Sequence, residues 1–262
     1  MKLGRLLGLV AGVVVLASCA TTSPPKAATP ASTTPAAAPW PPVYMQAVAD
    51  ARNPTPDKVV HNLIPIVRSN THLVWKEIDG VAHVLMATLA GNTTYYDGKV
   101  GRPYDTGSHD IWVSAVPELH DRCVQPGFSR GDLAMRLRQI LGLTPASTVT
   151  AFVEFWVAPA QLFRPAPDNE VTDDTAGLTM PAETEPWYRL WFNTTRAAQY
   201  FQSAVPKNDA YPWTQLGYTY DWGNPGRPQG VSEFVIKKNS TVTINAITAF
   251  AAYCAPAPGD AR

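Results

Sequence analysis

Hydrophobic and polar residues follow one another along the chain in short, changing patterns that predict several strands and a few helices. The best hairpin signal is Asp79-Gly80, because this turn pair joins two apolar runs at 73–78 and 81–89. Further runs with strand character occupy residues 110–116, 150–157, 215–222, 231–237 and 241–249. The last two runs are expected to form a second hairpin around Lys238-Asn239-Ser240.

Three helices are predicted, at about 56–63, 133–141 and 187–201. Thr55 followed by Pro56 fits an N-cap and first-turn pair for the first helix. Ser129, with Asp132 three residues later, has the spacing of a capping box for the second, and Gly142 would end it. The third has one apolar stripe, formed by Trp187, Leu190, Trp191 and Ala198. Hairpins combined with packed helices predict an α+β domain with a largely antiparallel sheet.

The N-terminus has the features of an export signal. Lys2 and Arg5 precede an uncharged apolar run at 6–17, which is too short to span a bilayer as a stable helix. The run leads into Leu16-Ala17-Ser18-Cys19, which resembles the lipobox of bacterial lipoproteins. The alternative is an ordinary secretory signal with an incidental cysteine.

The lipobox resemblance has consequences for processing and location. It implies that residues 1–18 are a signal peptide, that Cys19 becomes the lipidated first residue, and that the lipid holds the protein in the bacterial cell envelope. Ala20 follows the cysteine where an Asp would favour the inner membrane, so the resemblance implies the outer membrane. The membrane is therefore the first expected partner.

Composition divides the rest of the chain. Residues 19–42 are expected to be a lipidated Cys followed by a tether, because positions 20–42 consist almost entirely of Pro, Ala, Thr and Ser. Residues 43–254 contain no second linker and no internal repeat, which predicts a single domain. Residues 255–262 are expected to form a flexible tail. The segments 212–223 and 231–236 resemble segments of uncharacterised exported bacterial proteins, to which no activity is attached.

Cys123 and Cys254 remain once Cys19 is assigned to lipid. Exported proteins meet an oxidising compartment, so one disulfide between these two residues is expected. The alternative is a reactive or metal-binding thiol, since His120 lies three residues before Cys123. That pair is half a zinc site at most, and no second pair completes it. We therefore expect no metal.

Charge and motifs exclude several classes of protein. The chain has 21 basic and 21 acidic residues, a balance that gives no footprint for nucleic acid. It contains no Gly-x-Ser-x-Gly elbow, no phosphate-binding Gly-x-x-x-x-Gly-Lys-Ser/Thr loop, no Gly-x-Gly-x-x-Gly and no His-Glu-x-x-His pattern. These motifs are the usual sequence signs of bound cofactors and of well-known hydrolases, so no cofactor is expected.

Two weaker constellations point to chemistry. Glu154 and Glu233 each lie inside an apolar β-prone run, where burial would raise the pKa of a carboxyl group. Two such groups about 5–10 Å apart are the acid and base, or nucleophile, of a glycosidase. Tyr218, Tyr220 and Trp222 share one face of an expected strand. Exposed, this row would be a platform for a ligand, and buried it would be core.

Two functions follow. The first is a lipid-anchored cell-envelope protein with a non-catalytic domain that binds an envelope protein or glycan, or has a structural role. The second is an anchored hydrolase that acts on glycans through Glu154 and Glu233. A deep cleft with two carboxylates would favour the enzyme, and a flat or shallow aromatic patch would favour binding. Whether the protein is an enzyme is left open by the sequence.

Overall fold

The computed structural model describes residues 40–129, 131–201 and 210–256. The expected signal peptide (1–18), Cys19, the tether as far as residue 39, and residues 257–262 of the expected tail lie outside the described residues. The described residues all belong to a compact unit that begins at Pro39.

Helices and strands are interspersed along the described part of the chain. The helices are α1 (Pro42–Ala51), α2 (Val116–Cys123), α3 (Leu133–Ile140), α4 (Pro186–Tyr200) and α5 (Phe250–Tyr253), with 3₁₀ turns at Pro56–Lys58, Thr94–Tyr96 and Pro159–Gln161. The strands are β1 (Trp75–Ile78), β2 (Val81–Ala90), β3 (Pro103–Asp105), β4 (Ile111–Ala115), β5 (Ala151–Val157), β6 (Leu162–Phe163), β7 (Tyr218–Tyr220), β8 (Gln229–Ser232), β9 (Phe234–Ile236) and β10 (Thr241–Ala249). The fold is α+β, as the sequence predicts.

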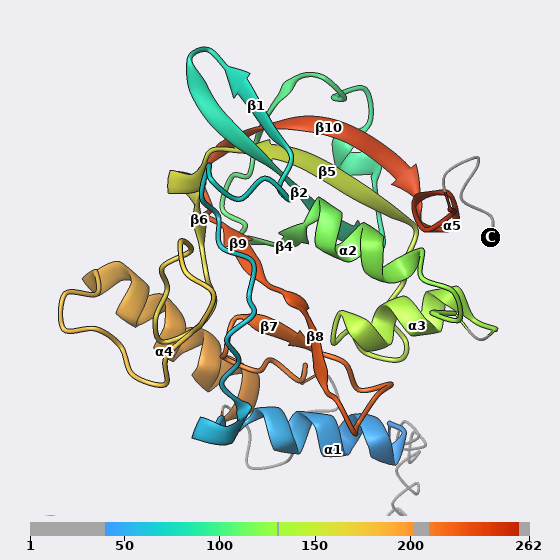
Figure 1. The fold of residues 1–262 in the computed structure, drawn as a ribbon, viewed down its shortest axis with the longest axis vertical. Helices are drawn as coiled ribbons and strands as arrows, with labels where there is room; N and C mark the ends of the chain where they lie inside the picture. The colour runs from blue at the N-terminus through green and yellow to red at the C-terminus, as the bar shows by residue number, and fades with distance from the viewer. Residues whose placement is uncertain (1–39, 130, 202–209, 257–262) are drawn as a thin grey trace, which may run out of the picture. The chain divides into compact units, whose positions relative to one another are not determined.

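Within the described residues, eight strands form one large sheet in the order β3-β10-β5-β2-β4-β9-β6, with β1 paired to β2. Each of these pairings is antiparallel, and β7 and β8 form a separate antiparallel pair. The long strands β10, β5 and β2 run side by side (Figure 1). The Asp79-Gly80 hairpin is confirmed, because Ile78 pairs with Val81 and both turn residues have positive φ.

Helices α2, α3, α4 and α5 gather on one face of the large sheet. Ala87 of β2 and Phe152 of β5 pack on this face against apolar residues of α2, α3 and α5. Further along the same face, Val235 of β9 packs against Tyr188 and Phe192 of α4. The opposite face carries the largest apolar cluster, which is covered mainly by coil segments rather than helices. Strand alternation therefore separates a helix-covered face from a coil-covered one.

The disulfide lies on the helix-covered face. Cys123 is the last residue of α2, and Cys254 directly follows α5. Their sulfur atoms are bonded and their Cα atoms are 5.2 Å apart, which matches the expected pairing. The bridge fastens the C-terminal end of β10, through α5, to the helix that follows β4. The interpretation of Cys123 as a metal-binding thiol is therefore excluded in this structure.

Helix α1 is an element that the sequence pattern did not reveal. It begins at Pro42, so the boundary predicted between tether and domain falls inside its first turn. Trp40 packs edge-to-face on Tyr44, and Tyr44 packs edge-to-face on Trp222. Pro42 is tolerated because the first helical N–H groups need no partner within the helix. The apolar face that holds α1 has only Tyr44, Ala47 and Ala51 fully buried, too few for a clear periodic signal.

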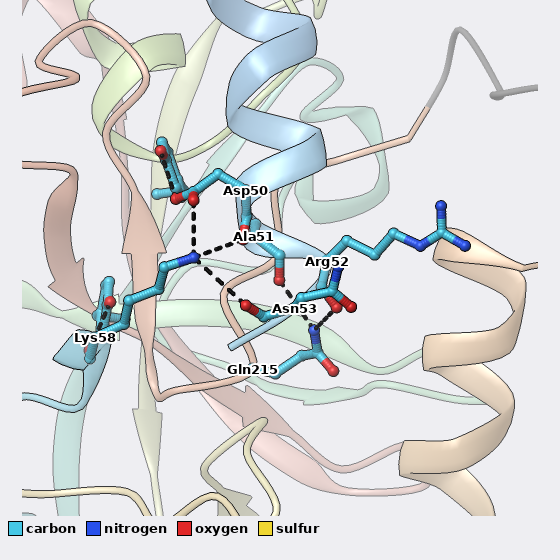
Figure 2. A network of polar contacts seen from close by, with 8 residues as sticks. Asp50, Ala51, Arg52, Asn53, Lys58 and Gln215 are labelled. Carbon is cyan, nitrogen blue, oxygen red and sulfur yellow. Dashed lines mark hydrogen bonds and ion pairs between the residues drawn. The ribbon is translucent and has the colours of Figure 1, made fainter. Parts of the chain in front are cut away.

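Polar contacts attach the C-terminal end of α1 to the domain (Figure 2). Nε2 of Gln215 donates hydrogen bonds to the backbone carbonyl oxygens of Ala51 and Arg52, at 3.1 and 3.3 Å. Nζ of Lys58 donates to both the carbonyl oxygen and the carboxylate of Asp50, at 2.9 and 2.8 Å. These groups supply partners for carbonyls that the end of a helix leaves unsatisfied.

Two helix predictions need correction. The helix predicted at 56–63 is only a 3₁₀ turn, because the chain leaves it to pair elsewhere and the N–H of Leu63 donates to Asp174 O. The helix-starting cap of α3 is Asp132, which accepts from Met135 N at 3.0 Å; Ser129 does not cap it. Thr55-Pro56 and Ser129 are residue types that occur in turns as well as at helix N-termini, so neither signal by itself decides for a helix.

The predicted stripe on α4 is only partly right, because Trp191 packs inwards but two of the other residues do not. Trp187 and Leu190 are 45% and 66% exposed, whereas Tyr188 and Phe192 are the residues that the helix buries. The stripe that points inwards is therefore rotated by one residue. Aromatic residues occur on both sides of this helix, so hydrophobicity alone did not decide which side faces the sheet.

The predicted final hairpin does not form. Strand β9 pairs with β4 and β6, whereas β10 pairs with β3 and β5. The connection between them is held by the segment before β4. Lys238 N donates to Asp110 Oδ1, and Asn239 N donates to Gly107 O. The strand predicted at 215–222 shortens to β7, because Gln215 and Gly217 adopt positive φ and bend the chain.

Candidate binding cavity

A cavity of about 470 Å³ lies on the helix-covered face of the large sheet. Its walls come from β2, β4, β7, α2, α4, the segment after α3, and residues 211–213. The lining is mainly aliphatic and aromatic, with hydroxyl and amide groups at intervals. Glu233 is the one charged side chain among the described residues that line it. This volume and composition are typical of a small-molecule site.

The floor of the cavity is one register row of the sheet. Ala87 of β2 pairs with Ser114 of β4. Val113 pairs with Phe234, so extending the β4–β9 register by one residue places Ser114 opposite Glu233. Ala87 and Ser114 are both buried and both small. Two adjacent short side chains leave space above the sheet that larger strand residues would fill.

One wall is formed by α4 and the segment 211–213. Thr195 and Gln199 line the cavity and are four residues apart, which places them on the same side of the helix. Nε2 of Gln199 donates to Tyr211 O at 2.7 Å, and the hydroxyl of Tyr200 donates to Trp213 O at 2.7 Å. These bonds hold the aromatic segment against the helix and fix the position of this wall.

The opposite wall is formed by the end of α3 and by β7. Gly142 ends α3 with φ +65°, and a Cβ there would lie 3.4 Å from Tyr220 O. Glycine is therefore suited to this position by its positive φ, which L side chains rarely adopt. The hydroxyl of Thr219 donates to Ile140 O at 2.6 Å, and that of Tyr220 donates to Asp50 Oδ2 at 3.0 Å. The second bond links the cavity wall to the α1 network.

Glu233 lies where the chain passes from the small sheet to the large one, between β8 and β9. Its backbone N–H leaves the β4–β9 ladder and donates to Gly217 O at 2.9 Å. The residue keeps a partial exposure, which fits its place on the cavity wall, but its Oε2 atom is covered and makes no hydrogen bond with any described residue. Burial alone raises the pKa of Glu233 to about 8. At neutral pH the group is therefore mostly a neutral carboxylic acid.

A second buried acid stabilises the same crossing point. Oε2 of Glu118, on α2, accepts from the backbone N–H of Ser232 at 2.9 Å. The hydroxyl of Ser232 accepts from Ile64 N at 2.9 Å. Burial raises the pKa of Glu118, and the hydrogen bonds from Ser232 partly oppose that shift. Glu118 thus fixes the backbone next to Glu233 without itself lining the cavity.

The structure does not bring Glu154 and Glu233 together as a catalytic pair. Glu154 lies on β5, and β2 and β4 separate β5 from β9. At about 4.8 Å between neighbouring strands, the backbones of the two residues are roughly 14 Å apart. Glu154 is not part of the cavity lining, and its Oε2 accepts from Asn245 Nδ2 at 2.6 Å. Among the described residues, the cavity therefore brings Glu233 to its wall without Glu154.

The aromatic row is core rather than an exposed platform. Tyr218, Tyr220 and Trp222 are only 5%, 8% and 3% exposed. Trp222 packs with α1, and Tyr218 belongs to a cluster with Leu63 and Leu216. Both sides of β7 are covered, so the row presents no outward face. Tyr220 alone of the three contributes to the cavity wall.

Sequence reasoning missed most of the cavity. The aromatic residues Trp112 and Trp213 and the polar residues Ser114 and Gln199 line it, but they come from distant parts of the chain. The signal that was present is a small polar residue inside the otherwise apolar strand 111–115. By itself such a residue does not reveal what lies opposite.

Neither a metal centre nor a membrane-spanning helix is found in the described part of the chain. No three His, Cys, Asp or Glu side chains among residues 40–129, 131–201 and 210–256 are grouped so that they could hold a metal ion. Over the same ranges, no helix has both the length and the apolar character needed to cross a bilayer.

Comparison with known proteins gives little further information. No family model matches the chain, and no solved structure matches it. A glycerol kinase from Roseobacter denitrificans (strain ATCC 33942 / OCh 114) is 40% identical over 76 residues. The matched segment covers 28% of this chain and 15% of that enzyme. The chain thus spans a small part of this curated relative.

Proposed function

We propose that this protein is a lipid-anchored cell-envelope protein whose α+β domain binds a small ligand in the cavity above Ala87 and Ser114. The observation that carries the binding function is the cavity itself. It is about 470 Å³, mainly apolar, and provided with a buried carboxyl group whose Oε2 lacks a partner among the described residues. A buried carboxyl group costs free energy, and a ligand that bonds to the part of it that lines the cavity would recover some of that cost.

The proposed anchor rests on the N-terminal sequence. The charged start, the short apolar run and the lipobox-like Leu16-Ala17-Ser18-Cys19 agree with one another, and lipid on Cys19 would provide stable attachment. The Pro- and Ala-rich residues that follow would then act as a spacer between the bilayer and the binding domain.

Binding is favoured over glycan hydrolysis by the position of the carboxyl groups. The cavity lining, as far as the structure describes it, contains one acid, Glu233. A hydrolase that works through two carboxylates needs both on the same substrate. Glu154, the expected second group, does not line the cavity, and its Oε2 accepts a hydrogen bond from Asn245.

The experiment that tests the anchor uses the full chain with its leader, expressed in bacteria that are fed a clickable palmitate. The wild type should label and fractionate with membranes, and Cys19→Ser should do neither. A matched variant, Cys254→Ser, removes a different cysteine and should still label. Equal labelling of wild type and Cys19→Ser would overturn the anchor.

The experiment that tests binding screens small molecules by thermal shift against the purified full chain. Compounds that use the cavity should stabilise the wild type and should lose their effect in Ser114→Leu, which places a larger side chain on the cavity floor. If every stabilising compound acts equally on both proteins, the cavity is not the binding site and the proposed function fails.

A further inference from the structure

The cavity has a charge character that selects among ligands. None of the described residues that line it is Lys, Arg or His, and Glu233 is its acid. An anionic ligand would find no positive partner there. A neutral ligand would leave the carboxyl group as a neutral acid. A cationic ligand would be the one type that gains an ion pair, in a setting where water does not compete.

No positively charged side chain among the described residues is paired with Glu233, so a ligand could supply the cation. The charged or titratable groups on the surrounding elements are Glu118, His120, Asp121 and Arg122 of α2, Arg136 and Arg138 of α3, Tyr188, Arg189, Arg196 and Tyr200 of α4, Tyr218 and Tyr220 of β7, His83 of β2, and Tyr211. Arg136, Arg138 and Arg196 bind elsewhere, to the carboxylate of Asp221, the carbonyl of Ser147 and the side chain of Gln215 respectively. Arg189 donates to the backbone carbonyls of Thr184, Pro181 and Ala182. The buried Arg164, which packs over the ring of Phe234, donates to the carbonyls of Glu170 and Asp173. On β4 the cavity residues are not titratable.

The cavity also offers aromatic rings. Trp112, Tyr211, Trp213 and Tyr220 contribute to its walls. Trp112 and Trp213 pack edge-to-face with ring centroids 5.8 Å apart, so their relative orientation is fixed by contact. Aromatic rings attract cations through their negative faces, and the effect is stronger where water is excluded. Aromatic groups together with one carboxyl group form a recognition set for an organic amine.

We propose that the ligand of this cavity is a small organic amine, bound as its ammonium ion, with an N–H group donating to the carboxylate of Glu233. This proposal rests on the proposed binding function and specifies its ligand class. Binding requires the carboxyl group of Glu233 to give up its proton to solvent, so that one ammonium ion enters as one proton leaves. The net charge of the cavity is therefore the same before and after binding, because the carboxylate and the ammonium ion together are neutral.

Proton release makes the affinity depend on pH. Since burial raises the pKa of Glu233 to about 8, the acid is protonated over the neutral range in the absence of ligand. An ammonium ion should therefore bind more tightly by about tenfold for each pH unit between pH 6 and pH 8, and its affinity should level off above pH 8. A neutral ligand that uses the acid as a hydrogen-bond donor should show the opposite trend.

The test compares three probes of similar size on the full chain in detergent: benzylamine, benzyl alcohol and sodium benzoate. Binding is followed by calorimetry and by intrinsic tryptophan fluorescence, to which Trp112 and Trp213 in the cavity wall contribute. Benzylamine should bind the wild type at pH 8 at least about tenfold more tightly than either other probe, and release a proton detectable in buffers of different ionisation enthalpy.

Two variants separate the ammonium proposal from the binding function. Glu233→Gln keeps the shape of the side chain and should lose the preference for benzylamine and its pH dependence. Glu154→Gln, the matched control outside the cavity, should keep both. If benzyl alcohol binds as well as benzylamine and only Ser114→Leu abolishes binding, the cavity still binds ligands and the ammonium proposal is overturned. Failure of benzylamine to bind the wild type at pH 8 also overturns it.

Discussion

Glu154 and Glu233 occupy the same register row of the large sheet and the same face of it. Glu154 pairs with Ala87 on β2, Ala87 pairs with Ser114 on β4, and Ser114 leads to Glu233 at the start of β9. The two acids have different surroundings, since Glu154 is held by Asn245 and Glu233 is buried at the cavity wall. The two small residues between them create the space that a ligand needs.

The first prediction concerns this row. Ser114→Leu should remove cavity volume with little loss of stability, within about 1 kcal/mol, because the added side chain has space to occupy. Ser240→Leu is the matched control, since Ser240 is also buried but does not line the cavity. That change should destabilise the fold by about 1–3 kcal/mol through overpacking. Urea denaturation of both variants measures the difference, and equal losses would contradict the assignment of the cavity floor.

The second prediction is a pH dependence of stability. The pKa of Glu233 is about 8 in the folded protein, above its usual value in the unfolded chain. Between these two values the folded state keeps a proton that the unfolded state has lost, so a rise in pH favours unfolding. Glu233 should therefore lower the free energy of unfolding by up to about 1.4 kcal/mol per pH unit as pH rises from about 5 to 8, with no further change above pH 8.

Glu233→Gln removes the titrating group and isolates this effect. Its free energy of unfolding relative to wild type should increase from pH 5 to pH 8 and then stay constant, as measured by urea denaturation without ligand. A wild type and Glu233→Gln that respond identically to pH would show that Glu233 is ionised in the fold.

The sequence was informative where a local pattern decides the structure. The Asp79-Gly80 hairpin and the strand at β5 follow from turn chemistry and from a run of β-branched and aromatic residues. Long-range pairing was not predictable in the same way. Strands β9 and β10 are neighbours in sequence but pair with different partners. The loop between them is held instead by hydrogen bonds to Gly107 and Asp110, which lie far earlier in the sequence.

The cavity illustrates the same limit for function. Glu233 was recognisable as an acid within apolar surroundings, and its raised pKa agrees with that expectation. The distance between Glu233 and its expected partner Glu154 could not be predicted. Strand order decides the separation of two strand residues, and the sequence pattern does not give strand order. The aromatic row failed for a related reason. Alternation showed that Tyr218 and Tyr220 share one face but not that α1 and other segments cover both sides.

The third prediction concerns the disulfide. Cys123 and Cys254 are 131 residues apart, a separation for which the chain-entropy account gives an upper value of about 5 kcal/mol. The double variant Cys123→Ala/Cys254→Ala should lose about 2–5 kcal/mol of stability, because α2 and α5 are no longer fastened to each other. Thermal unfolding with and without reductant provides the measurement.

Reductant provides the control for that prediction. It should lower the unfolding temperature of the wild type towards that of the double variant and should leave the double variant unchanged. Alkylation of the free thiols shows when the disulfide is fully reduced. If the unfolding temperature of the wild type is unchanged at that point, the disulfide has no stabilising role. Since Leu119 of α2 lines the cavity, loss of the bridge should also weaken ligand binding.

The last prediction concerns the attachment of α1 through Gln215. This side chain donates to the carbonyl oxygens of Ala51 and Arg52 and accepts from Nε of Arg196 at 2.6 Å. Gln215→Ala should cost about 1–3 kcal/mol, because it leaves buried acceptors and a donor without partners. Backbone strain should stay similar, since both residues carry a Cβ at the same positive φ.

Hydrogen exchange of the α1 amides gives the sharper measurement. In Gln215→Ala the amides of residues 46–51 should exchange faster, because the C-terminal end of α1 loses its attachment to the domain (Figure 2). Asn239→Ala changes another residue at positive φ, φ 57°, on an exposed turn far along the chain, and should leave α1 exchange unaltered. Because Tyr220 reaches Asp50 of α1 from the cavity wall, a loosened α1 should also reduce the affinity of the cavity. Unchanged exchange in Gln215→Ala would mean that the apolar contacts of Tyr44 and Ala47 hold the helix without the polar network.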